Sequence, residues 1–321
     1  MSNVSNKDDW ENSRAHLLLL SKFLHGDSAS RYDNLDFWEA ALKEQPAKAI
    51  KRFLDRGMLE PAELPNLVDH KFRSNELKTM LKERGLKVSG QKSDLIQRLI
   101  ENDPGAMRDA TRDLVLWRCT PSAATVAQRY LEEEEKKKIE TESETLRLLS
   151  TGDLLGAVSC VVRHERDCVF PRGIGVDWKN RDTAADVEVL KTIFQRIPDI
   201  LKDIERTRLD AIRVSAAMMH LWGTSRVRQW LPDGFETGFR LNADIASRML
   251  VAHAFCLRQI KEYRESRVVK VVEILGAGDS CPECQQICGR KYALNKVPEL
   301  PYSKCTSELG CRCDVIPCDI R

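Results

Sequence analysis

The sequence predicts a mainly α-helical protein of several domains that ends in a small α+β module rich in cysteine. Three observations support this fold class. Apolar residues recur at helical spacing through most of the 321 residues. Two short helical patterns near residues 70–103 are separated by a glycine-containing loop. Seven of the eleven cysteines lie between Cys281 and Cys318, which in a cytosolic protein favours a metal site over disulfides.

The first segment, 1–64, is expected to hold three helices. Apolar positions and helix-stop residues place them at 9–25, 35–43 and 46–56. Gly57 directly follows the third pattern and is typical of a helix end. Pro61 and Pro65 then predict a short linker before the next unit.

Composition limits the classes of partner. The longest apolar cluster near the start, Leu17 to Leu20, is far too short to span a bilayer, and it lacks the basic flank of a signal peptide. We therefore expect a cytoplasmic or nucleoid-associated protein without a membrane partner. The net charge of +2 is nearly neutral, so any contact with nucleic acid must come from a local basic face.

The second segment, 65–103, predicts two packed helices. Ser74 is a suitable N-cap, and the apolar face of the first helix ends at Gly85, which can adopt a left-handed conformation. Leu86 and Val88 are expected to point back into the core, and Ser89-Gly90 turns the chain into the second helix. The core positions are Leu77, Met80, Leu81, Leu95, Ile96, Leu99 and Ile100.

This segment is also locally basic. Between His70 and Glu101 there are eight Lys or Arg residues and four Asp or Glu residues, a local charge of +4. The second helix begins just after Gly90, and the free N–H groups of a helix N-terminus suit a phosphate oxygen. Lys92 lies in that first turn, where the helix dipole disfavours a cation unless an anion is near.

The ordered motifs Leu-Lys-x-x-Leu-Lys, Gly-Leu-x-x-Ser-Gly and Lys-x-Asp-Leu-Ile-x-Arg-Leu resemble the SAP domain, a helix–extended loop–helix unit of DNA-associated proteins. The resemblance implies weak contacts to the DNA backbone without base-specific readout. It implies that the contacting residues are Lys82, Lys87, Ser89, Gly90, Gln91, Lys92 and Arg98. A structural helical hairpin or a protein-docking module remains an alternative.

The third segment, 104–267, is expected to be a helical central domain that binds a protein partner or self-associates. The run from Glu132 to Lys138 pairs opposite charges one turn apart and predicts a solvated helix. Acidic residues that could hold a divalent metal occur after a glycine-containing break: Asp177, Asp182, Asp186 and Glu188. They leave open a metal-dependent nuclease, or another DNA-processing enzyme of a phage or mobile element, with its active site in 150–260.

The fourth segment, 268–321, begins with a β-branched strand over 268–275 and continues into the cysteines. Cys281 and Cys284 have the C-x2-C spacing at which one tight turn directs two thiolates to one ion. The preferred Zn²⁺ ligands are Cys281, Cys284, Cys305 and Cys313, with Cys311 as the competing fourth ligand. Four thiolates leave no open coordination position, so the zinc is expected to be structural. A redox role for the thiols or a catalytic zinc remains an alternative.

The same tail resembles the C-terminal module of phage head-morphogenesis proteins, through its C-x2-C pair, Gly289, the proline-containing stretch 297–301 and Cys311-Arg312-Cys313. It departs from that pattern because no histidine precedes the Cys-Arg-Cys end. The resemblance implies a metal-binding fold and leaves a virion-assembly protein as a further alternative. The preferred prediction is a DNA-binding protein with a structural zinc module, more plausibly a binding protein than an enzyme.

Overall fold

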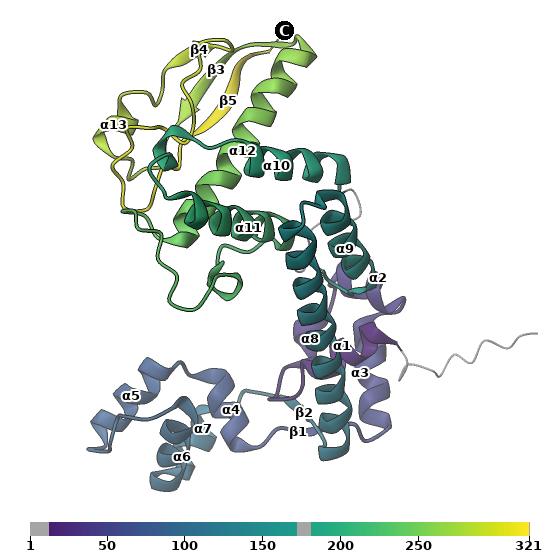
Figure 1. Cartoon of the computed structure of the whole chain (residues 1–321). Coiled ribbons are helices and arrows are strands. Elements are labelled where there is room, and N and C mark those ends of the chain that lie inside the picture. Colours follow the sequence, from purple (N-terminus) through teal and green to yellow (C-terminus); the bar gives the residue numbers. More distant parts are fainter. Residues whose placement is uncertain (1–12, 172–180, 321) are drawn as a thin grey trace, which may run out of the picture. The chain divides into compact units, whose positions relative to one another are not determined.

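The computed structural model describes residues 13–171 and 181–320. The chain forms two compact units, Met1–Lys137 and Lys138–Arg321, and the boundary falls inside the long helix α8 (Pro121–Ser150) (Figure 1). The expected fold class is confirmed: helices dominate both units, and a small sheet and a cysteine cluster lie near the C-terminus. The four-segment division stays a prediction.

The N-terminal helices follow the predicted pattern. They are α1 (Arg14–Ser21), α2 (Asp36–Leu42) and α3 (Pro46–Asp55), with a 3-10 turn at Ala29–Tyr32. The Tyr32 ring lies 5.6 Å from the Phe23 ring and 5.9 Å from the Trp38 ring. Gly57 has a φ of +65°, so it ends α3 in the left-handed conformation that glycine adopts without steric cost.

The expected linker at Pro61 and Pro65 is wrong. Pro61 belongs to strand β1 (Leu59–Pro61), which pairs antiparallel with β2 (Trp117–Cys119), and Pro65 lies in the first turn of the next helix. A three-residue strand is too short to show alternation, and proline is tolerated in an edge strand. The two ends of segment 62–116 are therefore held together by the two-stranded ribbon of β1 and β2.

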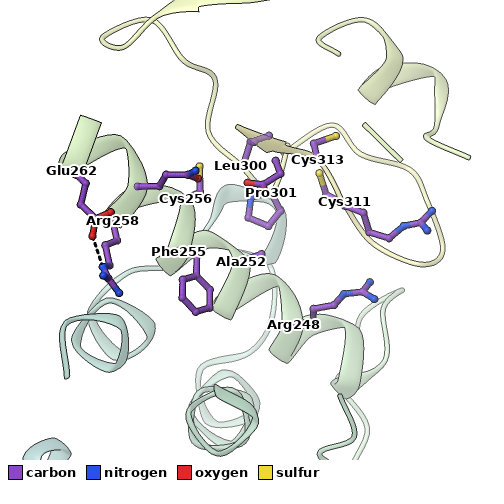
Figure 2. A pocket seen from close by; sticks show the side chains of 13 residues that line it. Arg248, Ala252, Phe255, Cys256, Arg258, Glu262, Leu300, Pro301, Cys311 and Cys313 are labelled. Atoms are coloured by element: carbon purple, nitrogen blue, oxygen red, sulfur yellow. Dashed lines mark hydrogen bonds and ion pairs between the residues drawn. The ribbon is translucent and has the colours of Figure 1, made fainter. Parts of the chain in front are cut away.

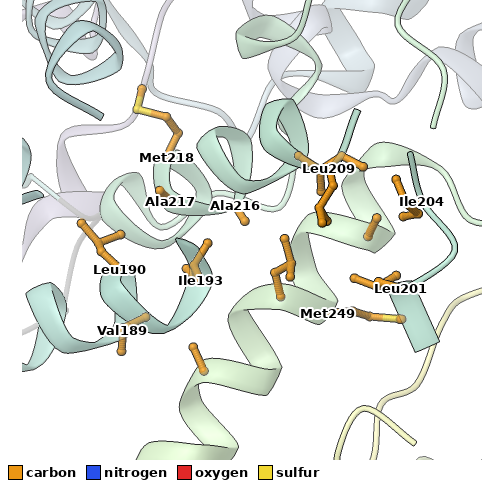
Figure 3. Packing of buried hydrophobic residues seen from close by; sticks show 14 of the residues in the cluster. Val189, Leu190, Ile193, Leu201, Ile204, Leu209, Ala216, Ala217, Met218 and Met249 are labelled. Atoms are coloured by element: carbon orange, nitrogen blue, oxygen red, sulfur yellow. The ribbon is translucent and has the colours of Figure 1, made fainter. Parts of the chain in front are cut away.

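The second unit consists of helices packed beside a small sheet. Its apolar core joins α9 (Leu154–Asp167), α10 (Thr183–Gln195), α11 (Arg206–Trp222) and α12 (Ala243–Ser266). Short 3-10 turns occur at Asp199–Leu201 and Arg228–Trp230. Figure 3 shows Val189 and Ile193 of α10, Met218 of α11 and Met249 of α12 among the side chains of this core.

The C-terminal sheet contains the expected strand as β3 (Val269–Leu275). It lies between β4 (Lys291–Ala293) and β5 (Asp314–Ile320), and both pairings are antiparallel. The short helix α13 (Pro282–Gln285) precedes β4. Among the helices of the described residues, none combines the length and apolarity that a membrane span needs.

Candidate nucleic-acid interface and thiol cluster

Residues 64–110 form a four-helix module with its own core. The helices are α4 (Leu64–Lys71), α5 (Ser74–Glu83), α6 (Lys92–Asn102) and α7 (Pro104–Ala110). Leu77, Leu81, Leu95 and Leu99 are completely buried. Val68 of α4 and Met107 of α7 close the same core. The two predicted helices are thus supported by a neighbour on each side, which so small a pair needs in order to bury enough apolar surface.

The ends of α5 and α6 are capped by their own carboxylates. The N-cap of α5 is Arg73 rather than Ser74, and the Arg73 N–H donates to the Glu76 carboxylate at 2.6 Å. The N-cap of α6 is Gln91, and its N–H donates to Asp94 Oδ2 at 2.9 Å. Both carboxylates also favour the positive end of the helix dipole.

The expectation that Val88 points into the core is wrong, since Val88 is 41% exposed. Leu86 does pack against the core. The loop between α5 and α6 is extended, so only one of its two apolar side chains can face inward.

Two of the predicted DNA contacts, Lys92 and Arg98, have intramolecular partners. Lys92 Nζ lies 2.9 Å from Asp69 Oδ1 and donates to the Asp69 carbonyl at 2.6 Å. The Arg98 guanidinium donates to the carbonyls of Lys87 and Ser89. Asp69, rather than a phosphate, offsets the unfavourable position of Lys92 at the helix start, and Arg98 holds the loop in place.

The other predicted contacts, Lys82, Lys87, Ser89, Gly90 and Gln91, are exposed. Lys78 and Lys82 lie one turn apart on α5, and Lys87 follows in the loop. In the described part of the chain no ion pair joins these three lysines to a carboxylate. The module therefore presents cations to solvent from α5 and from the loop that precedes α6.

Six of the seven C-terminal cysteines gather in one cluster, which we call the thiol cluster. The sulfurs of Cys281, Cys284 and Cys305 lie within 4.8 Å of one another, and so do those of Cys284, Cys311 and Cys313. Cys288 Sγ lies 3.8 Å from Cys313 Sγ. The structure thus brings together every predicted ligand and adds Cys288, which the spacing alone left without a role.

Backbone amides stabilise thiolates in this cluster. The Thr306 N–H points at Cys281 Sγ at 3.4 Å, and the Tyr302 N–H points at Cys311 Sγ at 3.2 Å. Burial alone would raise the pKa of Cys281, but hydrogen bonds from Cys284 and Thr306 lower it to about 7. The Cys313 thiol donates to Cys311 and, against burial, lowers the pKa of Cys311 to about 6. Thiolates are the form that binds soft metal ions.

A cavity of about 650 Å³ lies between α12 and the thiol cluster (Figure 2). Phe255, Leu300 and Pro301 line it, together with Cys311 and Cys313. Arg248 and Arg312 also border it, but Arg248 donates to the Leu309 carbonyl and Arg312 pairs with Asp279. The cavity leaves one side of the cluster accessible to solvent.

The acidic candidates of the central segment have structural partners. Asp182 caps α10 by accepting from the N–H groups of Ala184 and Ala185 at 3.0 Å. Glu188 pairs with Lys261. Asp177 lies outside the described residues. Within those residues, the only groups that could hold a metal ion are the two cysteine sets.

Asp186 belongs to a buried ion network. Its carboxylate binds Arg181 and accepts from His220 Nε2 at 2.8 Å, and Arg181 also binds Glu165 at 2.6 Å. Burial alone would raise the pKa of Asp186, but the hydrogen bonds from His220 and Arg181 outweigh burial and lower it. His253 Nδ1–H donates to the Leu300 carbonyl at 2.8 Å. Both histidines are therefore hydrogen-bonded residues of the core.

Comparison with known proteins identifies one part of the chain. A family model described as the SAP domain matches residues 70–104. No curated protein and no solved structure matches the chain. The match covers α5 and α6 with the loop between them, so residues 70–104 are a SAP domain, a unit that suggests nucleic-acid binding.

Proposed function

We propose that this protein binds DNA through its SAP domain, by contacts to the phosphate backbone, and that a zinc-braced C-terminal module stabilises its second unit. One observation carries the proposal: the matched domain presents Lys78, Lys82 and Lys87 to solvent without carboxylate partners. Unpaired cations on a small helical surface attract phosphates regardless of base sequence. A cytoplasmic or nucleoid location is part of the same proposal.

The interface is expected to be small. Lys92 and Arg98 already have partners inside the domain, so a phosphate would have to compete with Asp69 or with loop carbonyls. Three free lysines, with the exposed polar loop Ser89 to Gln91, can neutralise only a few phosphates. Binding should therefore be weak, non-specific and strongly dependent on salt.

The thiol cluster fits zinc by its chemistry. Thiolates are soft ligands that select Zn²⁺ among the common divalent ions, and an all-thiolate site is structural because no position is left for substrate. The residues that would hold the ion are Cys281, Cys284 and Cys305, with a fourth thiolate from Cys313 or Cys311. The nuclease and virion-assembly alternatives stay predictions, since no contact among the described residues favours either one.

The DNA-binding proposal is tested with the triple variant Lys78→Gln, Lys82→Gln and Lys87→Gln. Binding of the full chain to a fluorescent duplex is measured by anisotropy from 50 to 200 mM salt. Each lost phosphate contact should reduce the slope of log K against log salt by about 0.9. We expect the slope to fall by roughly 2 to 3 and the affinity at low salt to drop at least tenfold.

The control is the triple variant Lys22→Gln, Lys48→Gln and Lys51→Gln. These exposed lysines lie in the same unit but outside the SAP domain, and their replacement changes the net charge by the same amount. The control should bind as the unmodified chain does. Equal slopes for the two variants would show that the SAP surface does not contact DNA.

A further inference from the structure

The thiol cluster holds more sulfurs than one tetrahedral ion can use. A single zinc takes four thiolates, whereas Cys281, Cys284, Cys288, Cys305, Cys311 and Cys313 all have another member of the cluster close by. Cys318 is not one of them, since its thiol donates to the Val271 carbonyl at 3.5 Å. If Cys311 is the fourth ligand of a one-ion site, the two cysteines left over, Cys288 and Cys313, have sulfurs 3.8 Å apart.

The six sulfurs divide into two groups that share a member. One group is Cys281, Cys284 and Cys305, and the other is Cys284, Cys311 and Cys313. At the outer ends, Cys281 Sγ and Cys305 Sγ are 3.7 Å apart, and Cys288 Sγ and Cys313 Sγ are 3.8 Å apart. A tetrahedral ion with Zn–S bonds of about 2.3 Å holds its sulfurs about 3.8 Å apart. Each outer pair is thus already spaced as two ligands of one ion.

Cys284 has the position that a bridging ligand needs, because it belongs to both groups and is only 2% exposed. A buried thiolate needs more compensation than an exposed one, and contact with two cations supplies it.

We propose that the thiol cluster binds two zinc ions rather than one. Cys281 and Cys305 are the terminal ligands of the first ion, Cys311, Cys313 and Cys288 are those of the second, and Cys284 bridges the two, which leaves the fourth position of the first ion to solvent. The inference rests on the zinc module of the proposed function and extends it. Six thiolates and two divalent ions carry a net charge of −2, the same as a single ion with four thiolates.

The backbone leaves room for the sixth ligand. A Cβ atom at Gly276 would lie 2.5 Å from Cys288 Sγ and 2.8 Å from Ser280 Oγ. Glycine at this position therefore allows Cys288 to approach Cys313. Arg240 holds the loop that carries Cys305 by donating to the Cys305 carbonyl.

The test is the metal content of the full chain, purified under reducing conditions with zinc present. Native mass spectrometry and elemental analysis give the number of ions per chain. Two ions are expected. One ion would overturn the two-ion cluster but leave the zinc module intact, and no ion would overturn both. A mass 2 Da lower, mapped to a Cys288–Cys313 disulfide, would also refute the cluster.

Two variants assign the second ion. Cys288→Ser should lower the content from two ions to one, and the matched control Cys318→Ser should keep two. Gly276→Ala should act like Cys288→Ser, since the added methyl group displaces the Cys288 thiol. In cadmium-113-loaded protein, the bridging sulfur of Cys284 predicts two NMR resonances coupled to each other. Two uncoupled resonances would refute the bridge.

Discussion

Replacing Asp186 by alanine tests whether the ion network organises the helical core of the second unit. The network is nearly enclosed: the exposed fractions of the Glu165, Arg181 and His220 side chains are 5%, 8% and 10%. The variant removes one of the two carboxylates that face Arg181 and the carboxylate that binds His220 Nε2. An arginine buried at this depth is left partly uncompensated.

The magnitude follows from the two lost contacts. Removing one member of a buried ion pair costs about 3–5 kcal/mol. Arg181 keeps Glu165 as a partner, so we expect the lower end, about 3 kcal/mol. Because each 1.4 kcal/mol is a factor of ten, amides in α10 and α11 should lose protection against hydrogen exchange by about a hundredfold.

Hydrogen exchange read by mass spectrometry reports on α10 and α11 separately from the first unit. The matched control is Asp210→Ala, which also removes an aspartate from an arginine, Arg213, but at a site where the aspartate is 57% exposed. Exposed pairs contribute about 0–1 kcal/mol. If both variants changed protection equally, the network would have no special role in the core.

The same variant should change the acid sensitivity of the unit. The pKa of Asp186 is lowered in the folded protein, so its contribution to stability is fully present above the unfolded pKa of about 3.9. That contribution is lost as the pH falls through the folded pKa. The Asp186→Ala variant should therefore lose less stability between neutral pH and pH 3 than the unmodified chain loses.

Two further substitutions separate the units. Leu99 is completely buried in the four-helix module, so Leu99→Ala should cost about 3–5 kcal/mol; anisotropy should show loss of DNA binding, while elemental analysis shows unchanged zinc. Retained DNA affinity would contradict the assigned surface. Gly310 has a φ of +72°, and a Cβ there would lie 2.7 Å from Ile245 and Met249. Gly310→Ala should therefore speed zinc transfer to a chromogenic chelator, and an unchanged rate would refute the packing argument.

The helical part of the SAP domain was predictable because its signals are local. Leu77, Leu81, Leu95 and Leu99 repeat at helical spacing, and all four are buried as expected. The N-cap of α5 is one residue earlier than predicted, at Arg73 in place of Ser74. The Glu76 carboxylate caps the helix by accepting from the Arg73 N–H. Such differences at helix ends are normal because several capping arrangements have similar free energies.

The partners of charged side chains were not predictable. Lys92 meets Asp69 across 23 positions of sequence, and the pairing depends on how α4 packs against α6. The same limit applied to Asp186, whose partner His220 lies on another helix. Sequence spacing predicts which charged residues can pair within one helix, but it does not predict which residues of different helices come together.

The thiol cluster was predictable in part. The C-x2-C spacing fixes two sulfurs on one turn, so Cys281 and Cys284 were identified from local geometry. The choice among Cys305, Cys311 and Cys313 depended on the path of a long loop, and Cys288 had no motif of its own. Cys288 approaches Cys313 because β3 and the loops beside it fold these two distant segments together.

The β1–β2 ribbon changes how the SAP domain is held. The sequence predicted a short linker at Pro61 and Pro65. In the structure, residues 62–116 are instead joined to the rest of the first unit by the paired strands β1 and β2. Ala62 N–H donates to the Leu116 carbonyl at 2.9 Å, and Lys71 pairs with Asp113 at 2.6 Å. Both ends of the four-helix module are therefore fastened side by side. A force on bound DNA acts on this ribbon through two chain segments at once, and no single flexible linker can absorb it.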